Sequence, residues 1–569
     1  MPSTAHPLGR PAFRHAVPAI VALLWTVWGG ARIAQTWTVL SPTADEPTHL
    51  GAGMELLDRG TYTYERLHPP LARAATALGP FLDGRRSTGA ADPITEGRRL
   101  LYADDATRRV LALARAGILP FFVLGALGVW WLATRLGDRW TAAVAVGLYA
   151  HLPPILAHAG LATTDMAGAA TFLLAVGGLA AWLERPTWNR AVALGVAGGL
   201  AVATKYSALP FLGSTAIGLV AWRRLVERTT WDPRQLVGAW RLALLAAGTA
   251  FLVVWGAHGF GVESLVGPRE RPYRHVDALV GAAGTAHDLV YAVIEAPIVP
   301  VALRSVRDGL VATLAKNREG HTGFLLGAMD TDGWWFFFPV AIAVKTPIPF
   351  LVLAAIGAWL AWRDGRRGSW RSGGPLIAIV AILAVSLPSR INIGLRHVLA
   401  IYPLLAILAA MAASWLWRLD AGRRRWPTRL FVVLLVAWQV VTVNAAHPDH
   451  LPWFNRLASA APERVLNDSD LDWGQDLDRL ADELATRDVE HVWLAYFGSA
   501  DTNRHDLPAF DVLPMDRPVE GWVAISLFQA RGLYLRAGPS GPYAWLAEHR
   551  PVTRVGASID LYFVAPPAP

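Results

Sequence analysis

Long apolar runs separated by short arginine clusters constrain this chain more than any other feature. A helix that spans a membrane needs about 17 to 25 mostly apolar residues, and about eleven runs approach that length. Apolar residues make up 53% of the chain and charged residues 17%, where about 25% charged is usual for soluble proteins. The pattern excludes a disordered chain, a coiled coil and most soluble enzymes, and it predicts a polytopic α-helical membrane protein with about eleven transmembrane helices. The predicted spans cover residues 16–40, 110–133, 140–157, 164–183, 190–204, 206–222, 240–258, 335–361, 375–388, 397–417 and 429–446.

The arginine clusters predict an orientation, because cytoplasmic loops of membrane proteins carry an excess of Lys and Arg. One set of alternate loops holds twenty arginines, and the opposite short loops hold only Lys205, Arg390 and Arg396. This bias predicts a multi-pass protein of the cytoplasmic (inner) membrane with a cytoplasmic N-terminus and an extracytoplasmic C-terminal domain. The first apolar run lacks a small-residue cleavage site, so we interpret it as a retained anchor. The twenty arginines are Arg10, Arg14, Arg135, Arg139, Arg185, Arg190, Arg223, Arg224, Arg228, Arg234, Arg241, Arg363, Arg366, Arg367, Arg371, Arg418, Arg423, Arg424, Arg425 and Arg429.

This topology predicts two parts. Residues 1–446 form a transmembrane catalytic region with outer loops at 41–109 and 259–334, and residues 447–569 form a small soluble mixed α/β domain on the outer face. The second part combines one helical period with strand-like runs. The helix is expected at Asp476–Arg487 and the strands at His491–Phe497, Trp522–Phe528 and Ile559–Val564.

Several classes of function are excluded by what the sequence lacks. Without cysteine, neither a disulfide framework nor a thiolate zinc site is possible. The sequence contains no GxxxxGK[ST], GxGxxG, HExxH or GxSxG pattern, which removes nucleotide-binding loops, zincins and the common hydrolase elbow as first hypotheses. The net charge is +8. The arginines lie mostly in the short clusters that predict the membrane topology, so no nucleic-acid partner is expected. The 26 Trp suit the two interfaces of a membrane.

Acidic residues mark the outer ends of two predicted spans. Asp45 and Glu46 follow the first span, and Asp165 begins the fourth. Acids beside a bilayer are costly unless they function or find partners. Neighbouring acids on a helix diverge by about 100°, so at most one of the first pair should point at a substrate. The alternative is that these acids only cap the helices that follow them.

Lysine is used sparingly. Only Lys205, Lys316 and Lys345 occur among 52 basic residues, and none lies in a cytoplasmic cluster. Lys205 ends a span and Lys345 lies within an apolar helix, where an anionic phosphate is a natural partner. Arg396-His397 adds a forked cation on the same side. The alternative is that both lysines extend toward lipid headgroups.

The acid-rich run Asp468-Ser-Asp470-Leu-Asp472-Trp473-Gly474-Gln475-Asp476 allows two interpretations. It can hold a cation, or it can cap the predicted helix that follows it. The sequence does not decide between them.

Taken together, the segments between about residue 40 and residue 480 resemble the GT-C superfamily of polyprenyl-phosphate-dependent glycosyltransferases. They are most similar to its family-39-like branch, which contains protein O-mannosyltransferases and the lipid A aminoarabinose transferase. Single motifs are short, and their order is the more specific signal. Ala72-Arg73 departs from the aromatics that often follow His-Pro-Pro-Leu in that branch, so the rim of the donor pocket is expected to differ. The matching motifs are Asp45-Glu46; Gly60-x-Tyr62 with His68-Pro69-Pro70-Leu71; Thr164-Asp165; Lys205-Tyr206; Gly320-His321-Thr-Gly323-Phe-Leu-Leu-Gly327; Gly333-Trp334-Trp335-Phe-Phe-Phe-Pro339 with Lys345-Thr-Pro347; Asn392-Ile-Gly394-Leu-Arg396-His397; and Leu471-Asp472-Trp473-Gly474-Gln475-Asp476-Leu477.

The resemblance implies transfer of a hexosyl or pentosyl group from a polyprenyl-phosphate sugar donor to a hydroxyl of a protein, lipid or glycan on the outer face, with inversion. A lipid phosphate leaves without needing a proton, so the catalyst requires only a base for the acceptor hydroxyl and cations for the phosphate. We expect no cofactor, and metal dependence stays open. The expected base is Asp45, supported by Glu46 and Asp165. The expected donor-phosphate residues are Lys205, Lys345, Arg396, His397, His68, Tyr62 and His321.

A transporter or lipid flippase is the alternative, because it also carries intramembrane Lys and Pro-broken helices. Transporters usually contain internal repeats and place charge at the middle of the membrane. No repeat is visible in this sequence, and the polar candidates gather at one face. A non-catalytic receptor or scaffold is a third possibility.

Overall fold

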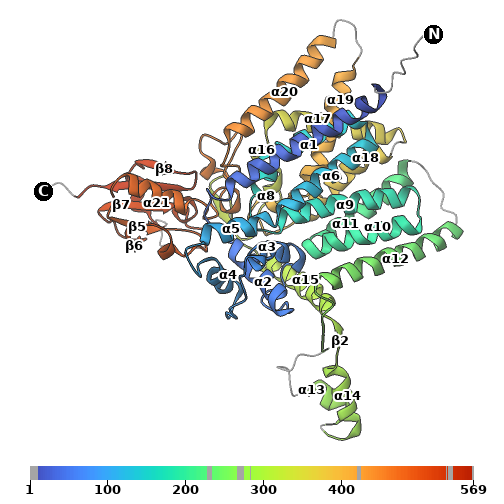
Figure 1. The fold of residues 1–569 in the computed structure, drawn as a ribbon, viewed down its shortest axis with the longest axis horizontal. Helices are drawn as coiled ribbons and strands as arrows, with labels where there is room; N and C mark the ends of the chain where they lie inside the picture. Colours follow the sequence, from blue (N-terminus) through green and yellow to red (C-terminus); the bar gives the residue numbers. More distant parts are fainter. Residues whose placement is uncertain are drawn as a thin grey trace, which may run out of the picture.

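The helices of this protein lie side by side in a bundle, with a smaller sheet beyond one end of it (Figure 1). The computed structural model describes residues 10–226, 233–264, 274–281, 283–368, 370–419, 425–533, 535 and 542–566. Arg228, Arg423 and Arg424 of the predicted cytoplasmic clusters fall outside the described residues. The longer helices are α1 (Arg10–Thr36), α6 (Leu119–Leu136), α7 (Arg139–Ala150), α8 (Pro153–Ala159), α9 (Asp165–Glu184), α10 (Trp188–Thr204), α11 (Ala208–Val226), α12 (Pro233–Ala257), α16 (Phe337–Lys345), α17 (Ile348–Arg366), α18 (Trp370–Ser386), α19 (Ile401–Arg418) and α20 (Arg425–Ala445).

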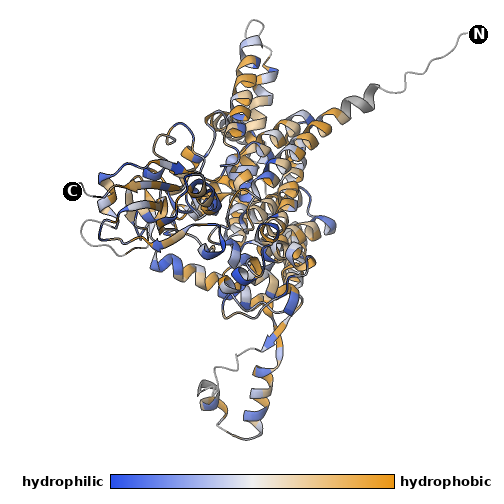
Figure 2. Ribbon diagram, turned by 60° about the vertical axis from the view of Figure 1, so that its left-hand side comes forward, coloured by the Kyte–Doolittle hydropathy of each residue, from blue (hydrophilic) through white to orange (hydrophobic). Residues whose placement is uncertain are grey.

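The apolar character of these helices makes this a multi-pass membrane protein. Seven described helices are long and apolar enough to cross a membrane, or eight when the bent pair α7 and α8 counts as one span. Large apolar side chains such as Leu24 on α1 and Val441 on α20 are exposed, as expected where lipid is the solvent. Hydrophobic residues run along the length of the helices (Figure 2).

Helices occupy all eleven regions predicted as spans, but fewer of them meet the requirement for length and apolarity. The helix α18 is apolar but has only 17 residues. The helix α11 carries Arg223 and Arg224 in its last turn, and these charges lower its apolarity. Seven or eight spans are therefore supported by length and composition among the described helices, and the higher number stays a prediction.

Proline breaks two of the predicted spans. Pro153 starts α8 after Leu152, and the axes of α7 and α8 differ by 67°. Pro347 separates α16 from α17. Proline lacks an amide N–H and clashes with the preceding turn, so a helix ends just before it.

Small residues allow the closest helix packing. On α10, Gly195 and Gly199 face α12 so closely that a Cβ atom would stand 2.5 Å from the carbonyl oxygen of Ala246 and 2.8 Å from that of Ala250. Two glycines four residues apart lie on one helix face, which lets two backbones meet inside a membrane.

Short helices cover one end of the bundle, after α1 and before α6. The helix α2 packs between α3 and α4, and α3 also contacts α5 and α10. A second covering segment lies between α12 and α16, with the two-stranded pairs β1–β2 and β3–β4. The elements are α2 (Glu46–Arg59), α3 (Pro70–Leu82), α4 (Pro93–Leu101), α5 (Thr107–Ala116), β1 (Val262–Ser264), α13 (Arg274–Val280), α14 (Thr285–Glu295), β2 (Pro297–Pro300), α15 (Val301–Glu319), β3 (Gly323–Leu325) and β4 (Ala328–Asp330).

The chain ends in a five-stranded mixed sheet in the order β6-β5-β7-β9-β8. The strand β5 is parallel to β6 and β7, whereas β9 is antiparallel to β7 and β8. The predicted helix and three strands are confirmed in this sheet region, while the short β6 and β8 were not predicted. The elements are α21 (Leu477–Thr486), β5 (His491–Ala495), β6 (Ala509–Val512), β7 (Gly521–Ser526), α22 (Leu527–Ala530), β8 (Thr553–Val555) and β9 (Ile559–Val564), with short 3-10 turns between them.

The segment between α20 and this sheet packs into the helical body. Phe454, Leu466 and Leu471 are buried in the same apolar core as the bundle helices. The Asn455 side chain donates to the carbonyl oxygens of Ala343 and Thr346. The boundary at residue 447 stays a prediction.

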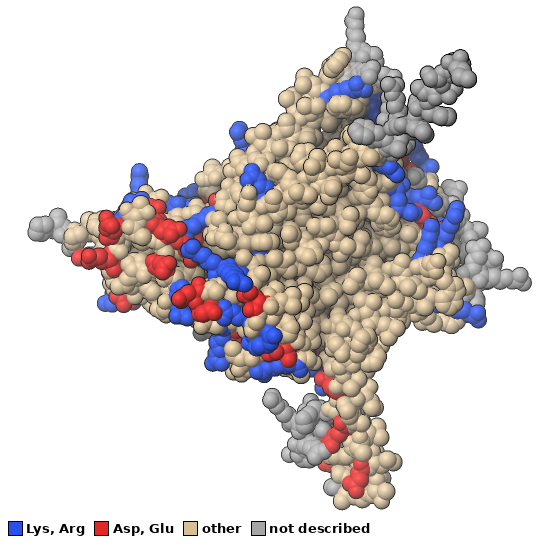
Figure 3. All heavy atoms as spheres, in the orientation of Figure 1, with Lys and Arg blue, Asp and Glu red and all other residues tan. Residues whose placement is uncertain are grey.

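Arginines and tryptophans form a rim at the bundle end opposite the sheet. Five guanidinium groups lie 5.0–5.7 Å from the centres of indole rings, which matches the aromatic belt expected at a membrane interface. Figure 3 shows blue atoms gathered at this end and a largely uncharged band between the two ends. The pairs are Arg135–Trp131, Arg223–Trp370, Arg363–Trp359, Arg366–Trp362 and Arg429–Trp417.

Candidate active site

The first component of the candidate site is an ion pair between two distant parts of the chain. Nη1 of Arg396 donates to Oδ2 of Asp45 over 2.5 Å. Asp45 occupies the N-cap position of α2, but its side chain makes no capping hydrogen bond, so its carboxylate is available to Arg396. The guanidinium also lies 4.4 Å from the centre of the Trp473 ring. The bundle and the acid-rich run therefore meet at Asp45.

The second component is another ion pair, formed where α9 begins and α10 ends. Lys205 Nζ donates to Oδ1 of Asp165 over 2.5 Å. His158 Nδ1 lies 4.0 Å from Oδ2 of Asp165. The preceding Thr164 makes no side-chain cap, so Asp165 serves Lys205 rather than a simple capping motif.

The two ion pairs adjoin one small cavity. A space of about 20 Å³ is lined by Asp165, Lys205, Arg396 and His397, together with apolar residues of α9 and α11 and of the segment just before α19. Nε of Arg396 and Nε2 of His397 are buried without a hydrogen-bond partner among the described residues. Buried polar atoms are rarely left unpaired in native proteins, so these two nitrogens call for a hydrogen-bond partner from a ligand or water.

Charge around Asp45 favours its ionised form. Burial alone would raise the pKa of the Asp45 carboxyl, but Arg396 and His49 outweigh burial and hold the pKa below its usual value. Burial, assisted by the positive charge of Arg73, lowers the pKa of His49 to about 3. At neutral pH the site therefore presents an ionised Asp45 beside a neutral His49.

Glu46 points away from Asp45, as expected for adjacent residues at a helix start. Its carboxylate accepts from Nε and Nη2 of Arg115, both at 2.8 Å. The backbone amides of Thr43 and Ala162 donate to it as well. Both oxygens are thus engaged in a buried network that fixes the loop after α1, and these contacts do not support Glu46 as a catalytic acid.

Tyr62 and His68 are linked to His49 of α2 by a buried arginine, Arg73. The Tyr62 hydroxyl donates to the His68 carbonyl oxygen over 2.6 Å and accepts from Nη1 of Arg73 over 2.9 Å. Arg73 Nε also donates to Nδ1 of His49, and the rings of His49 and His68 are 5.3 Å apart. Arg73 therefore holds the His-Pro-Pro loop against α2.

His321 and Lys345 have other surroundings. His321 is half-buried between α15 and β3, and burial lowers its pKa. Lys345 Nζ donates to the carbonyl oxygens of Leu451 and Asp470 at 2.6 and 2.5 Å. Lys345 is not among the residues that line the cavity beside Lys205 and Arg396. Of the three Lys and Arg residues expected to bind the donor phosphate, Lys205 and Arg396 therefore line one cavity and Lys345 does not.

The acid-rich run anchors loops. Asp472 accepts from the backbone amide of Phe528, and Asp470 accepts from that of Leu395. Asp476 precedes α21 but makes no side-chain cap; it accepts from the amide of Ala557 and the hydroxyl of Ser558. Among the described residues, no group of three or more His, Asp or Glu is arranged to hold a metal ion.

Three contributors were not predicted in the roles that the structure gives them: Trp473, Arg73 and Arg115. Trp473 appeared in a motif, but nothing in the sequence pairs it with Arg396. Arg73 and Arg115 are both fully buried. One feature of the sequence could have identified them: each is an arginine within an apolar stretch, that of α3 or α5, and lies outside the arginine clusters that predict the membrane topology.

Comparisons with known proteins give only distant matches. No family model and no curated protein matches the chain. The oligosaccharyltransferase of Archaeoglobus fulgidus, solved with a tethered acceptor peptide, is 13% identical with a TM-score of 0.45 over 77% of this chain and 55% of its own. ArnT from Cupriavidus metallidurans bound to undecaprenyl phosphate is 14% identical with a TM-score of 0.47 over 96% of this chain and 99% of its own. Its apo state gives a TM-score of 0.48.

The chain spans about half the length of that oligosaccharyltransferase. No particular family is identified for this chain. Identities of 13–14% with TM-scores below 0.5 are too low to transfer a function.

Proposed function

We propose that this protein is an integral-membrane glycosyltransferase that moves a sugar from a polyprenyl-phosphate donor to an acceptor hydroxyl. The observation that carries the proposal is the pairing of Asp45 with Arg396 beside the pairing of Asp165 with Lys205, around a cavity with unpartnered donors. The order of motifs that resembles GT-C enzymes supports the same assignment.

In the proposed step, a bond forms between the acceptor oxygen and C1 of the sugar, on the face opposite the phosphate. The bond between C1 and the phosphate oxygen breaks, and the configuration at C1 inverts. The acceptor proton goes to Asp45, and the electron pair leaves with the lipid phosphate. Because the leaving group needs no proton, a single weak base suffices, and the low pKa of Asp45 is compatible with this role.

The donor phosphate is proposed to bind Lys205, Arg396 and His397. Nε of Arg396 and Nε2 of His397 have no partner among the described residues, and a phosphate oxygen is a strong acceptor for both. The present cavity of about 20 Å³ is smaller than a phosphate, so donor binding has to separate these side chains. Arg396 is placed to give up part of its contact with Asp45 and to bind the donor phosphate instead. The Asp45 carboxylate is then free to accept the proton of the acceptor hydroxyl.

Charge placement favours this enzyme over a transporter. Asp165 begins α9, and Lys205 follows the end of α10. Transporters place their charged sites near the middle of the membrane, whereas both of these residues stand at helix ends. A receptor or scaffold gives no reason for buried cations with unpaired donors.

The orientation is proposed from the arginine rim: the N-terminus faces the cytoplasm, and the sheet and candidate site face outward in the cytoplasmic membrane. A reporter enzyme fused after Pro569 checks this orientation. Activity of the reporter only in the cytoplasm overturns it.

The direct test of function uses purified protein and synthetic polyprenyl-phosphate sugars. We expect release of polyprenyl phosphate that depends on both protein and a hydroxyl acceptor. Vectorial movement of intact donor across vesicles without release would instead identify a flippase.

A further inference from the structure

A second polar crevice lies at the opposite end of α9 from the candidate active site. Asp165 begins this helix and Glu184 ends it, so the two acids are separated by roughly 28 Å at 1.5 Å rise per residue. The crevice has a volume of about 120 Å³ and opens between α6, α9, α11 and α18. It takes no part in the proposed transfer reaction.

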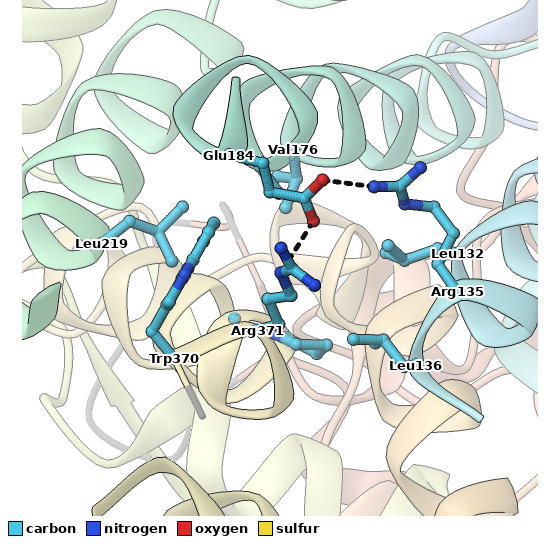
Figure 4. A pocket seen from close by; sticks show the side chains of 11 residues that line it. Leu132, Arg135, Leu136, Val176, Glu184, Leu219, Trp370 and Arg371 are labelled. Carbon is cyan, nitrogen blue, oxygen red and sulfur yellow. Dashed lines mark hydrogen bonds and ion pairs between the residues drawn. The ribbon is translucent and has the colours of Figure 1, made fainter. Parts of the chain in front are cut away.

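Three arginines converge there on one carboxylate. Oε2 of Glu184 accepts from Nη2 of Arg135 over 2.5 Å and lies 3.6 Å from Nη1 of Arg190. Oε1 of Glu184 lies 3.2 Å from Nε of Arg371. Figure 4 shows Glu184 between Arg135 and Arg371, with Leu132, Leu136 and Val176 beside them. One negative charge therefore faces three positive charges.

The side chains in this crevice differ in exposure: the Glu184 carboxylate is largely buried, and the arginine side chains are more exposed. The Glu184 side chain is 11% exposed, whereas those of Arg135 and Arg371 are 36% and 62% exposed. A guanidinium has five N–H donors, so a contact with Glu184 uses only some of the donors of each arginine. Glu184 positions the arginines without neutralising the crevice.

The crevice also lies where lipid headgroups are expected. Trp370 lines it, and the guanidinium of Arg223 lies 5.0 Å from the centre of the Trp370 ring. Both belong to the rim of Arg–Trp pairs that marks one membrane interface. Basic pockets between helices at such a level bind anionic headgroups, with acyl chains along the neighbouring apolar surface.

We propose that this crevice binds the headgroup of an anionic phospholipid, with its phosphate on Arg135 and Arg371 and its acyl chains against the outer surfaces of α6 and α18. The excess of positive charge selects an anionic lipid over a zwitterionic one. Glu184 keeps the guanidinium groups oriented when the lipid is absent.

The test is retention of added phosphatidylglycerol or phosphatidylcholine by the purified full chain, measured by native mass spectrometry. Wild-type protein is expected to retain phosphatidylglycerol preferentially. The double variant Arg135→Ala/Arg371→Ala is expected to bind it roughly 10- to 30-fold more weakly. The matched control is Arg363→Ala/Arg366→Ala, which removes two Trp-stacked charges from the same rim but outside the crevice, and it should bind as the wild type does.

The variant Glu184→Gln distinguishes a lipid-binding site from a brace, that is, an ion-pair cluster that only holds the helices together. At a lipid site, loss of the internal anion tightens phosphatidylglycerol binding, even if the melting temperature falls. At a brace, the melting temperature falls and lipid retention does not rise, which overturns the proposal. Equal retention of both lipids, or complete displacement of phosphatidylglycerol by millimolar inorganic phosphate, overturns it as well.

Discussion

Arg396 and Asp45 lie 351 residues apart in the sequence, and Nη1 of the arginine donates to Oδ2 of the aspartate over 2.5 Å. The contact brings the end of the first bundle helix to the loop before α19. The same arginine borders the cavity that holds Lys205 and Asp165. A carboxylate for the acceptor and cations for the donor are thereby adjacent, which is the arrangement that the proposed chemistry requires.

Replacing Asp45 with Asn removes the proposed base while keeping the size of the side chain. We expect turnover of folded protein to fall by about 10² to 10⁴, measured as release of polyprenyl phosphate at saturating donor. The exposed Asp506→Asn is the control and should keep wild-type turnover. Near-normal turnover of Asp45→Asn contradicts the assignment, and Asp165 is then the next carboxylate to test.

The pH dependence should reveal the coupling between Asp45 and Arg396. Arg396 keeps the pKa of Asp45 below its usual value against the effect of burial. Activity of the wild type therefore falls only when acidification reaches that low pKa. In Arg396→Gln the largest influence that lowers this pKa is lost, so the acidic limb of kcat should move to higher pH.

The nearby Arg390→Gln is the matched control, because Arg390 pairs with Asp332 instead. Its acidic limb should stay in place. An unchanged limb in Arg396→Gln shows that Asp45 is not the group that limits activity in acid.

Lys205 and Lys345 should differ in what their loss affects. Lys205 borders the cavity, so Lys205→Gln is expected to raise KM for the donor. Lys345 binds two buried carbonyl oxygens, so Lys345→Gln should cost roughly 1–3 kcal/mol for each carbonyl left unpaired, with KM unchanged. The two measurements are donor KM and melting temperature. A raised donor KM in Lys345→Gln restores the three-cation site predicted from the sequence.

The sequence predicts more of the fold than of the candidate site. Apolar length predicts a helix wherever lipid requires one, because every backbone polar group has to be satisfied within the span. It does not predict that residues between Phe454 and Leu471 enter the core of the bundle. This packing depends on tertiary contacts that leave no periodic pattern.

Within the site, the type of a residue indicated that it belongs to the site, but it did not indicate which group the residue contacts. Lysine is scarce in the sequence, which marks Lys205 and Lys345 equally. Only the structure shows that Lys205 faces Asp165 and that Lys345 faces backbone carbonyls. Asp45 and Glu46 are likewise indistinguishable in sequence. Their divergence by about 100° around a helix predicts that they differ in role, but not which of them meets Arg115.

Glu46→Gln should act on stability rather than on catalysis. The substitution leaves the fully buried Arg115 without its counter-ion, and breaking one side of a buried pair typically costs about 3–5 kcal/mol. We expect a clearly lower melting temperature with turnover per folded molecule near that of the wild type. Asp45→Asn, measured in parallel, should show the opposite pattern. A Glu46→Gln protein that is stable but inactive would return Glu46 to the catalytic set.

The titration of Asp472 should make the folded protein less stable as the pH rises, which is the opposite of the usual effect of an aspartate. Burial raises the pKa of its carboxyl from 3.8 to about 7 in the folded protein. Between these two values the folded protein holds a proton that the unfolded chain has lost, so folding takes up a proton. Stability from this group is therefore fully present below about pH 4, declines as the pH rises toward 7, and is constant above that.

Asp472→Asn removes this titration, while its amide oxygen can still accept from the Phe528 amide, as Oδ2 of Asp472 does over 2.7 Å. The melting temperature of the wild type should therefore decline more between pH 5 and pH 8 than that of the variant, and the exposed Asp506→Asn should follow the wild type. Parallel curves for Asp472→Asn and wild type would mean that the carboxyl is ionised in the folded protein across this range. The amides of Phe528 and Gly474 would then have to stabilise a buried charge, which requires the loop at Asp472 to be more open to water than its buried position indicates.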